Sequence, residues 1–213
     1  MFRAALDRIV RAGAGLRRAA PLDAPPDSDL VVLDTETTSL DRRKAEILAI
    51  GAIRIRGNRL MTSQSLRVAI KPRSPVPGSS IRIHGLRTID LAHGVPVETA
   101  LERLTDFAGA RPLVGYYLEF DLAVINRALA ECAGQRLANP RIEISSLYYD
   151  YTIRQRRFQP IQGEVDLSFD SIMANLKLPR LPKHDPINDA IMTGLAYLKL
   201  RHLMEPARGP AAA

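Results

Sequence analysis

Four carboxylates and one imidazole stand in three short clusters of this sequence, and together they could carry out hydrolysis. The clusters are Asp34 with Glu36, then Asp121, and finally His184 with Asp189. Carboxylate oxygens are the ligands that hard divalent cations prefer, so the four acids form a candidate site for Mg²⁺ or Mn²⁺. A histidine beside such cations could accept a proton from an attacking water near neutral pH. The set therefore indicates metal-dependent hydrolysis of a negatively charged substrate.

The first cluster follows the apolar run 30–33, which predicts a buried strand over 30–34. Side chains at i and i+2 of a strand point to the same face, so Asp34 and Glu36 aim at one spot. Two like charges held this close repel each other unless a cation lies between them. An acidic loop in solvent is the structural alternative, and the pair alone does not decide between the two.

The second cluster contains Asp121, in the first turn of a helix expected over 120–133. Apolar residues recur there at helical spacing, as Leu122, Ile125 and Leu129. A carboxylate in a first turn is also favoured by the helix dipole, which is the structural alternative for this residue.

The third cluster has a geometry that local rules determine. Asp185 is a good N-cap and Pro186 a good first helical residue, which predicts a last helix over about 187–203. His184 then stands in the loop just before the helix and Asp189 in its first turn, so the two can converge on one site. The alternatives are a surface loop histidine and a dipole-favoured charge.

In combination, the clusters resemble the motifs of the DEDD exonuclease superfamily. The subgroup is the one whose general base is a histidine five positions before the last aspartate, as in bacterial polymerase III epsilon subunits, RNase T and oligoribonuclease. Residues 34–40 read Asp-Thr-Glu-Thr-Thr-Ser-Leu, close to the family's Asp-Thr-Glu-Thr-Thr-Gly-Leu. His184 with the pair 189–190 fits the family's His-x4-Asp-Ala. The resemblance runs from about residue 30 to 200.

The resemblance implies a fold and a mechanism. The fold would be α/β and RNase H-like, with a mixed five-stranded sheet of three antiparallel strands followed by strand–helix alternation. Helices would flank the sheet, and the acidic site would lie at its carboxyl edge. The four carboxylates would hold two Mg²⁺ or Mn²⁺ ions, and His184 would deprotonate the attacking water. Ser39 replaces the family glycine, and would be strained if that turn needs a positive φ.

Four further residues are candidate substrate contacts. Thr37 and Leu40 match positions that lie against the terminal nucleotide in relatives, and His84 lies in a segment that resembles one bordering the active site. For His84 a simple turn histidine is the alternative. Tyr116 and Tyr117 replace a family His-Asn pair, and Tyr117 could stack on a base, with structural packing as its alternative.

The implied activity is a 3'-5' exonuclease that releases nucleoside 5'-monophosphates from DNA, with RNA as a further substrate. One alternative is an exoribonuclease that trims RNA 3' ends, and another is a proofreading subunit of a polymerase. A catalytically dead nucleic-acid-binding module would lack at least one of the five residues, and all five are present. The expected partners are single-stranded 3' ends of DNA or RNA, and a polymerase or other repair protein.

Composition sets broader limits on the protein. The chain has 213 residues, a net charge of +7 and one cysteine. This length suits one sizeable core, and one cysteine excludes an internal disulfide, which agrees with a reducing, cytoplasmic compartment. No apolar stretch reaches the length of a membrane span. A positive surface suits a polyanionic partner, although nucleotide bias in a genome also produces arginine-rich, alanine-rich chains.

The sequence divides into three parts. Residues 1–28 are expected to form a basic amphipathic helix and a proline-rich linker, residues 29–204 the exonuclease domain, and residues 205–213 a disordered tail. The remaining expected elements of the domain are strands over 47–56, 60–70, 112–115 and 141–144, a loop over 71–80, and helices over 98–108 and 168–176.

Overall fold

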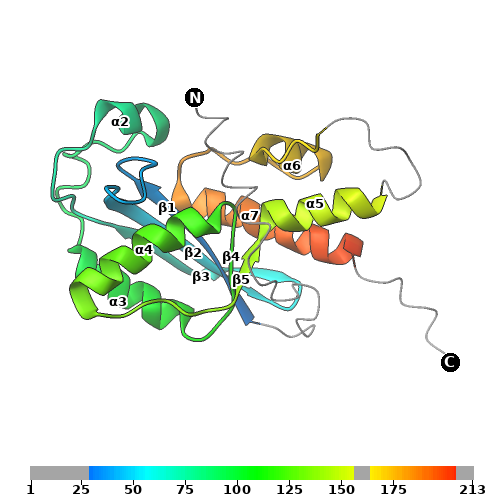
Figure 1. The fold of residues 1–213 in the computed structure, drawn as a ribbon, viewed down its shortest axis with the longest axis horizontal. Helices are drawn as coiled ribbons and strands as arrows, with labels where there is room; N and C mark the ends of the chain where they lie inside the picture. The colour runs from blue at the N-terminus through cyan, green and yellow to red at the C-terminus, as the bar shows by residue number, and fades with distance from the viewer. Residues whose placement is uncertain (1–28, 156–163, 205–213) are drawn as a thin grey trace.

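The computed structural model describes residues 29–155 and 164–204, which form a sheet covered by helices (Figure 1). The expected helix and linker over 1–28 and the expected tail over 205–213 lie outside the described residues. The strands are β1 Asp29–Thr37, β2 Ile47–Arg56, β3 Arg59–Ala69, β4 Leu113–Gly115 and β5 Arg141–Glu143. The helices are α2 Gly78–His84, α3 Val97–Ala108, α4 Leu118–Ala133, α5 Ile144–Gln155, α6 Phe169–Asn175 and α7 Pro186–Met204.

The five strands form one mixed sheet in the order β3-β2-β1-β4-β5. The pairs β1–β2 and β2–β3 are antiparallel, whereas β4 runs parallel to β1 and β5 parallel to β4. Gly57 and Asn58 form the turn between the paired residues Arg56 and Arg59, as their turn chemistry predicts. The predicted RNase H-like arrangement, three antiparallel strands followed by strand–helix alternation, is confirmed.

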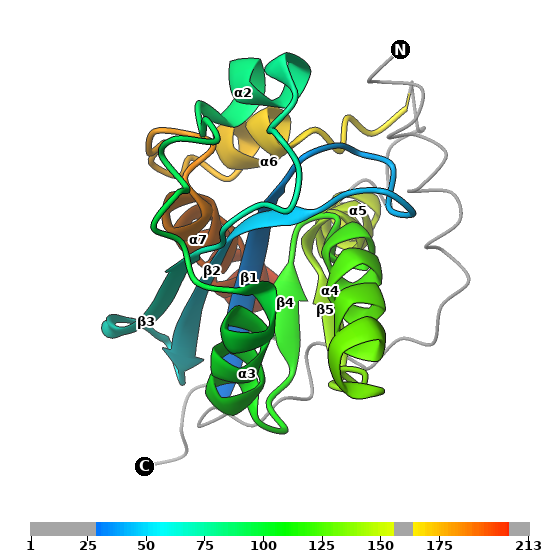
Figure 2. The same cartoon turned by 90° about the vertical axis from the view of Figure 1, so that its left-hand side faces the viewer.

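The sheet has an apolar layer on each face (Figure 2). Because side chains alternate along a strand, Val31 and Leu33 of β1 pack with α3 and α4 on one face, and Leu30 and Val32 pack with α5, α6 and α7 on the other. All four side chains are buried. No helix in the described residues combines the length and apolarity that a membrane crossing needs.

The strand β1 continues three residues beyond its expected end. Its pairing with β2 extends to Thr37, so Glu36 lies within the strand together with Asp34. Asp34 and Glu36 share the parity of Val32 and therefore face α7, whereas Thr35 faces α4. The alternation that packs the core thus also sets the direction of the first acidic pair.

Two helices differ from the sequence-based expectation. The helix α2 begins at Gly78, inside the segment expected to be a loop, because Pro77 is compatible with the position just before a first turn. The helix α5 follows β5 directly, and its last seven residues, 149–155, are exposed or half-buried, so its apolar period is too weak to recognise.

Candidate active site

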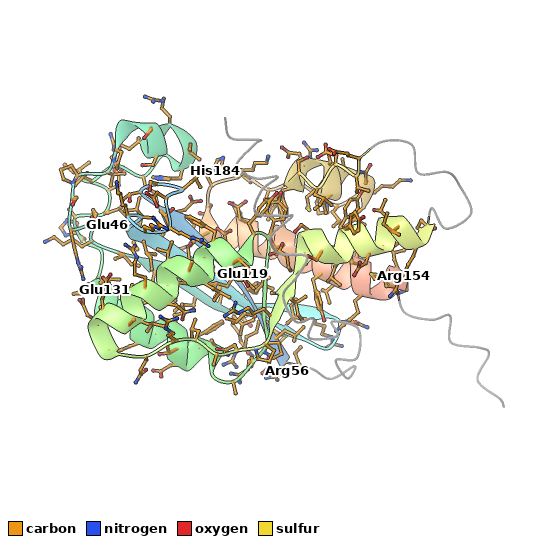
Figure 3. The ribbon with its side chains drawn as sticks, in the orientation of Figure 1. Glu46, Arg56, Glu119, Glu131, Arg154 and His184 are labelled. Carbon is orange, nitrogen blue, oxygen red and sulfur yellow. The ribbon has the colours of Figure 1, made fainter. Side chains whose placement is uncertain are left out.

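The acidic clusters meet where β1 and β4 end and α4 and α7 begin. Glu36, His184 and Asp189 offer ligand atoms that all lie within 4.8 Å of one another. Burial, and next the charges of Asp121 and Asp189, raise the pKa of Asp34, so these two carboxylates lie near Asp34. Figure 3 shows His184 at this end of the sheet, next to the start of α7. The structure thus brings together the five residues that the motifs predict, from four segments of the chain.

Burial and mutual repulsion raise the pKa values of the clustered carboxylates. Burial, and next the charges of Asp189 and Asp121, raise the pKa of Glu36 to about 8. Burial also raises the pKa of Asp121 to about 7, although a hydrogen bond from Thr35 opposes the shift. The pKa values of Asp34 and Asp189 are raised as well, in both cases chiefly by burial.

The donor set fits divalent cations. Among the described residues, no lysine or arginine forms a salt bridge with any of the four clustered carboxylates. Buried acids without a basic partner carry an electrostatic cost that a bound cation would offset. Oxygen donors of this kind suit Mg²⁺ or Mn²⁺. The site is therefore a candidate acidic metal centre.

Thr35 supports the cluster from the opposite face of β1. Its hydroxyl donates a hydrogen bond to Oδ1 of Asp121, 86 positions away in the sequence. The strand β1 thereby supplies two carboxylates on one face and a hydrogen bond to the third carboxylate on the other. Sequence reasoning did not identify Thr35, although its position between Asp34 and Glu36 was the available signal.

Glu143 anchors the start of α4, the helix that carries Asp121. Its carboxylate accepts hydrogen bonds from the backbone N–H groups of Tyr117 at 3.0 Å and Leu118 at 2.9 Å. Its Oε1 also accepts from the N–H of Ser145 at 3.1 Å. Tyr117 supplies no side-chain cap to α4, so Glu143 satisfies N–H groups that would otherwise lack a partner in the helix. No local sequence pattern indicated this role.

His184 occupies an exposed loop with a left-handed backbone, at φ 61°. The backbone N–H of His184 donates a hydrogen bond to Oδ2 of Asp189 at 2.9 Å. Asp185 caps α7 as predicted, because its Oδ1 accepts from the N–H groups of Ile187 and Asn188. Asp185 is itself held by Arg67 of β3, which donates two hydrogen bonds of 2.6 Å to its two oxygens.

The predicted substrate contacts differ in exposure. Leu40 is 55% exposed, whereas Thr37 is buried and donates its hydroxyl to the carbonyl of Ser39 at 2.9 Å. Ser39 is absent from the left-handed residues of the described chain, so its replacement of a glycine causes no strain. His84 is buried, and its Nδ1 accepts from the N–H of Leu86 at 3.0 Å. Burial and then the nearby His184 lower the pKa of His84.

The two tyrosines that replace His-Asn form an aromatic cluster with α6. The rings of Tyr116 and Tyr117 pack edge to face, with their centroids 4.3 Å apart. The centroid of the Tyr116 ring also lies 4.8 Å from that of Phe169. The hydroxyl of Tyr116 donates to the carbonyl of Leu167. Tyr117 is left-handed, at φ 58°. Packing therefore accounts for Tyr116, while Tyr117 stands at the start of the helix that bears Asp121.

An RNase H-like sheet with clustered carboxylates at one end defines a class of nucleases. The sequence profile of the RNase T exonucleases matches residues 31–197 of the chain, which is most of its length. The protein therefore belongs to this exonuclease family and is a nuclease hydrolase.

Curated relatives include polymerase subunits. The chain is 23% identical over 174 residues to the DNA polymerase III subunit epsilon of Aquifex aeolicus, covering 82% of this chain and 81% of that protein. It is 26% identical over 179 residues to a PolC-type DNA polymerase III of Thermotoga maritima. That match covers 84% of this chain but only 12% of the polymerase.

Solved nuclease structures share the fold. Cell-death related nuclease 4 superposes with a TM-score of 0.69 at 14% identity, covering 84% of this chain and 65% of that one. Exonuclease I of E. coli with a dA16 oligonucleotide superposes with a TM-score of 0.67 at 15% identity, covering 83% of this chain and 41% of that one. Exonuclease X with duplex DNA gives 0.62 at 18% identity, with coverages of 82% and 92%. The chain thus corresponds to less than half of exonuclease I and to most of exonuclease X.

Proposed function

We propose that residues 29–204 form a two-metal-dependent 3'-5' exonuclease domain that releases nucleoside 5'-monophosphates. DNA is the first substrate class to consider and RNA the second. The observation that carries the proposal is the convergence of the four carboxylates with His184 at one end of the sheet. The family membership and the structural likeness to exonucleases agree with it.

The roles of the five residues follow from their chemistry. Asp34, Glu36, Asp121 and Asp189 would hold two Mg²⁺ or Mn²⁺ ions, which when bound supply charge stabilisation of the phosphoryl group and a more acidic water. His184 would accept the proton of that water. Its exposed loop position leaves the imidazole accessible to solvent and substrate.

Four further residues would line the position of the terminal nucleotide. Leu40 presents an exposed apolar side chain to a base. Tyr117 is half-buried and offers an aromatic ring for stacking, which is worth roughly 1–3 kcal/mol per base. Thr37 and His84 are buried beside each other and would shape the pocket floor more than bind the base directly.

The test is degradation of a 5'-labelled single-stranded DNA oligonucleotide with Mg²⁺ or Mn²⁺, beside the RNA of the same sequence. Wild type would be compared with Asp34→Ala and with Asp106→Ala, an exposed acid on α3 that serves as a matched control. We expect a ladder that shortens from the 3' end, present in the control and absent in Asp34→Ala or with EDTA. The relative rates on the two sugars distinguish a deoxyribonuclease from an RNA-trimming enzyme.

Three outcomes would contradict the proposal. Shortening from the 5' end would overturn the direction, and cleavage that survives in EDTA would overturn the metal dependence. Binding without cleavage of either oligonucleotide would favour a nucleic-acid-binding module. A proofreading subunit remains an alternative physiological role because of the relationship to epsilon subunits, and it predicts that a polymerase copurifies with the chain and stimulates cleavage of a mismatched end.

A further inference from the structure

A shallow hollow of about 600 Å³ lies along α4, and none of the five clustered site residues lines it. Four arginines line it, and each comes from a different segment. Arg42 lies between β1 and β2, Arg127 on α4, Arg136 between α4 and β5, and Arg141 on β5. None of the catalytic roles proposed above uses this surface.

Several residues of the hollow are close in sequence to residues proposed for the active site. Leu122, the residue after Asp121, lies in its wall, as does Ala123. On the opposite side, Arg42 follows Leu40 by two residues. From Leu122 the hollow continues along α4 to Ala130, a distance of about 12 Å at the rise of an α-helix. It is therefore placed to receive material that extends beyond a terminal nucleotide.

The charge of the hollow is positive. Two acids, Glu119 and Glu131, face the four arginines, and Figure 3 shows both acids along α4. Glu119 is engaged by Arg141 in a salt bridge of 2.8 Å. Arg42 and Arg136 are exposed. The excess of cationic side chains favours a polyanion over a neutral or acidic surface.

One wall of the hollow is fixed before any ligand binds. Arg127 donates one hydrogen bond to the carbonyl of Arg43 at 2.6 Å and another to the carbonyl of Ala45. These bonds tie the segment that carries Arg42 to α4. Because the segment is already ordered, binding at Arg42 has less conformational entropy to overcome.

We propose that this hollow binds the phosphates of a single strand upstream of the 3'-terminal nucleotide held in the active site. The inference rests on the proposed function for the direction of the strand. Arg42 and Arg136 contact backbone phosphates, whereas Arg127 holds the wall in position. The ligand chemistry is a chain of phosphodiesters, which DNA and RNA share, so the contacts carry no base preference.

The test measures binding and not cleavage. Fluorescence anisotropy of labelled dT and rU oligonucleotides of 2 to 12 nucleotides, in EDTA, would be followed over a salt series. The double variant Arg42→Gln/Arg136→Gln would be compared with wild type and with Arg56→Gln/Arg59→Gln. That control removes the same charge at the opposite end of the sheet, since Arg56 pairs with the first residue of β1.

Two lost phosphate contacts lower the slope of log K against log salt by about 1.4 for a single strand. We expect this decrease, and roughly tenfold weaker binding of the 12-mer at about 0.1 M salt, for the hollow variant only. The difference from wild type should shrink as the oligonucleotide is shortened. Equal decreases in the binding of dT and rU oligonucleotides support recognition of the phosphate backbone. A decrease confined to one of them shows that the hollow binds only that nucleic acid.

An unchanged slope in the hollow variant would overturn the proposal, as would an equal decrease in the control variant. The outcome is independent of the exonuclease test. A wild-type protein that binds through the hollow but fails to cleave would overturn the proposed function alone, whereas 3'-end cleavage with an unaffected hollow variant would overturn this inference alone.

Discussion

The carboxylates Asp34 and Glu36 lie on the central strand of the sheet, whereas His184 lies in an exposed loop before α7. On the carboxylate side, β1 is paired along both edges and packed on both faces. On the histidine side, His184 has a left-handed backbone. It is positioned by the hydrogen bond from its backbone N–H to Asp189 and by the neighbouring ion pair between Arg67 and Asp185. The fold therefore determines the positions of the proposed cation ligands, while a few local contacts determine the position of the proposed base.

The largest expected effect separates catalysis from cation binding. His184→Ala should lower kcat by roughly 10²–10⁴-fold, the usual range for a general base, and should retain the thermal stabilisation that Mn²⁺ produces. Asp34→Asn should lose both the activity and the stabilisation. Single-turnover cleavage and melting with and without Mn²⁺ measure the two properties. Loss of the Mn²⁺ effect in His184→Ala would assign the imidazole to the cation ligands instead.

The carboxylate side should also make stability depend on pH. The pKa of Glu36 rises from 4.5 to about 8 on folding, so the folded protein holds a proton that the unfolded chain releases. Without cations, stability should therefore be greatest below about pH 4.5 as far as this group contributes, and should fall until about pH 8. Melting in EDTA at pH 6 and 8.5 should show a decrease of several degrees, at about 3 °C for each kcal/mol.

Two controls sharpen this measurement. Glu36→Gln should flatten the pH dependence because it removes the titrating group. Mn²⁺ should reverse the trend, since cations bind the ionised carboxylates and stabilise the folded state by mass action. A melting temperature that does not change between the two pH values in EDTA would contradict the electrostatic description of the site.

Arg67 tests how the histidine side is held. Arg67→Gln removes the two hydrogen bonds from the guanidinium to Asp185. We expect kcat to fall about tenfold, which is typical for residues that orient a metal ligand or a catalytic group through a hydrogen bond. Stability should change by less than about 1 kcal/mol because the ion pair is exposed. Arg59→Gln on the same strand is the matched control. Equal kcat values for both variants would show that the loop holds His184 without Arg67.

The smallest expected effect concerns Thr35. Thr35→Val keeps the shape of the side chain and removes the hydrogen bond to Asp121, at a cost of about 1 kcal/mol. We expect kcat to decrease a few-fold. The Mn²⁺ concentration that gives half-maximal activity should be higher than for wild type. Thr62→Val on β3, an exposed position, serves as control. An unaltered Mn²⁺ titration would mean that Asp121 keeps its position without Thr35.

The residues predicted from sequence are those whose geometry depends on near neighbours. Alternation in a strand directed Asp34 and Glu36 to one face, and the cap at Asp185 placed Asp189 in a first turn. The residues that were missed act across the fold. Arg67 meets Asp185 at a separation of 118 residues, and Glu143 meets Tyr117 at a separation of 26. No local pattern specifies such partners.

Tyr117 shows how structure explains a departure that sequence could only record. Its backbone is left-handed, a conformation in which asparagine is enriched and tyrosine is not. The asparagine that the family resemblance implies at this position suits this conformation, and Tyr117 adopts it at an energetic cost. The backbone N–H bond to Glu143 helps to hold that conformation.

Gly51 of β2 lies opposite Asp34 in the sheet, directly beneath the start of α7. A Cβ at this position would lie 2.3 Å from the carbonyl carbon of Pro186 and 2.7 Å from the backbone nitrogen of Ile187. An alanine there would push α7, and Asp189 with it, away from the sheet. A chain with that single replacement would keep every motif residue, and a search by motif alone would score it as intact although the carboxylates of its candidate cation site had been moved apart.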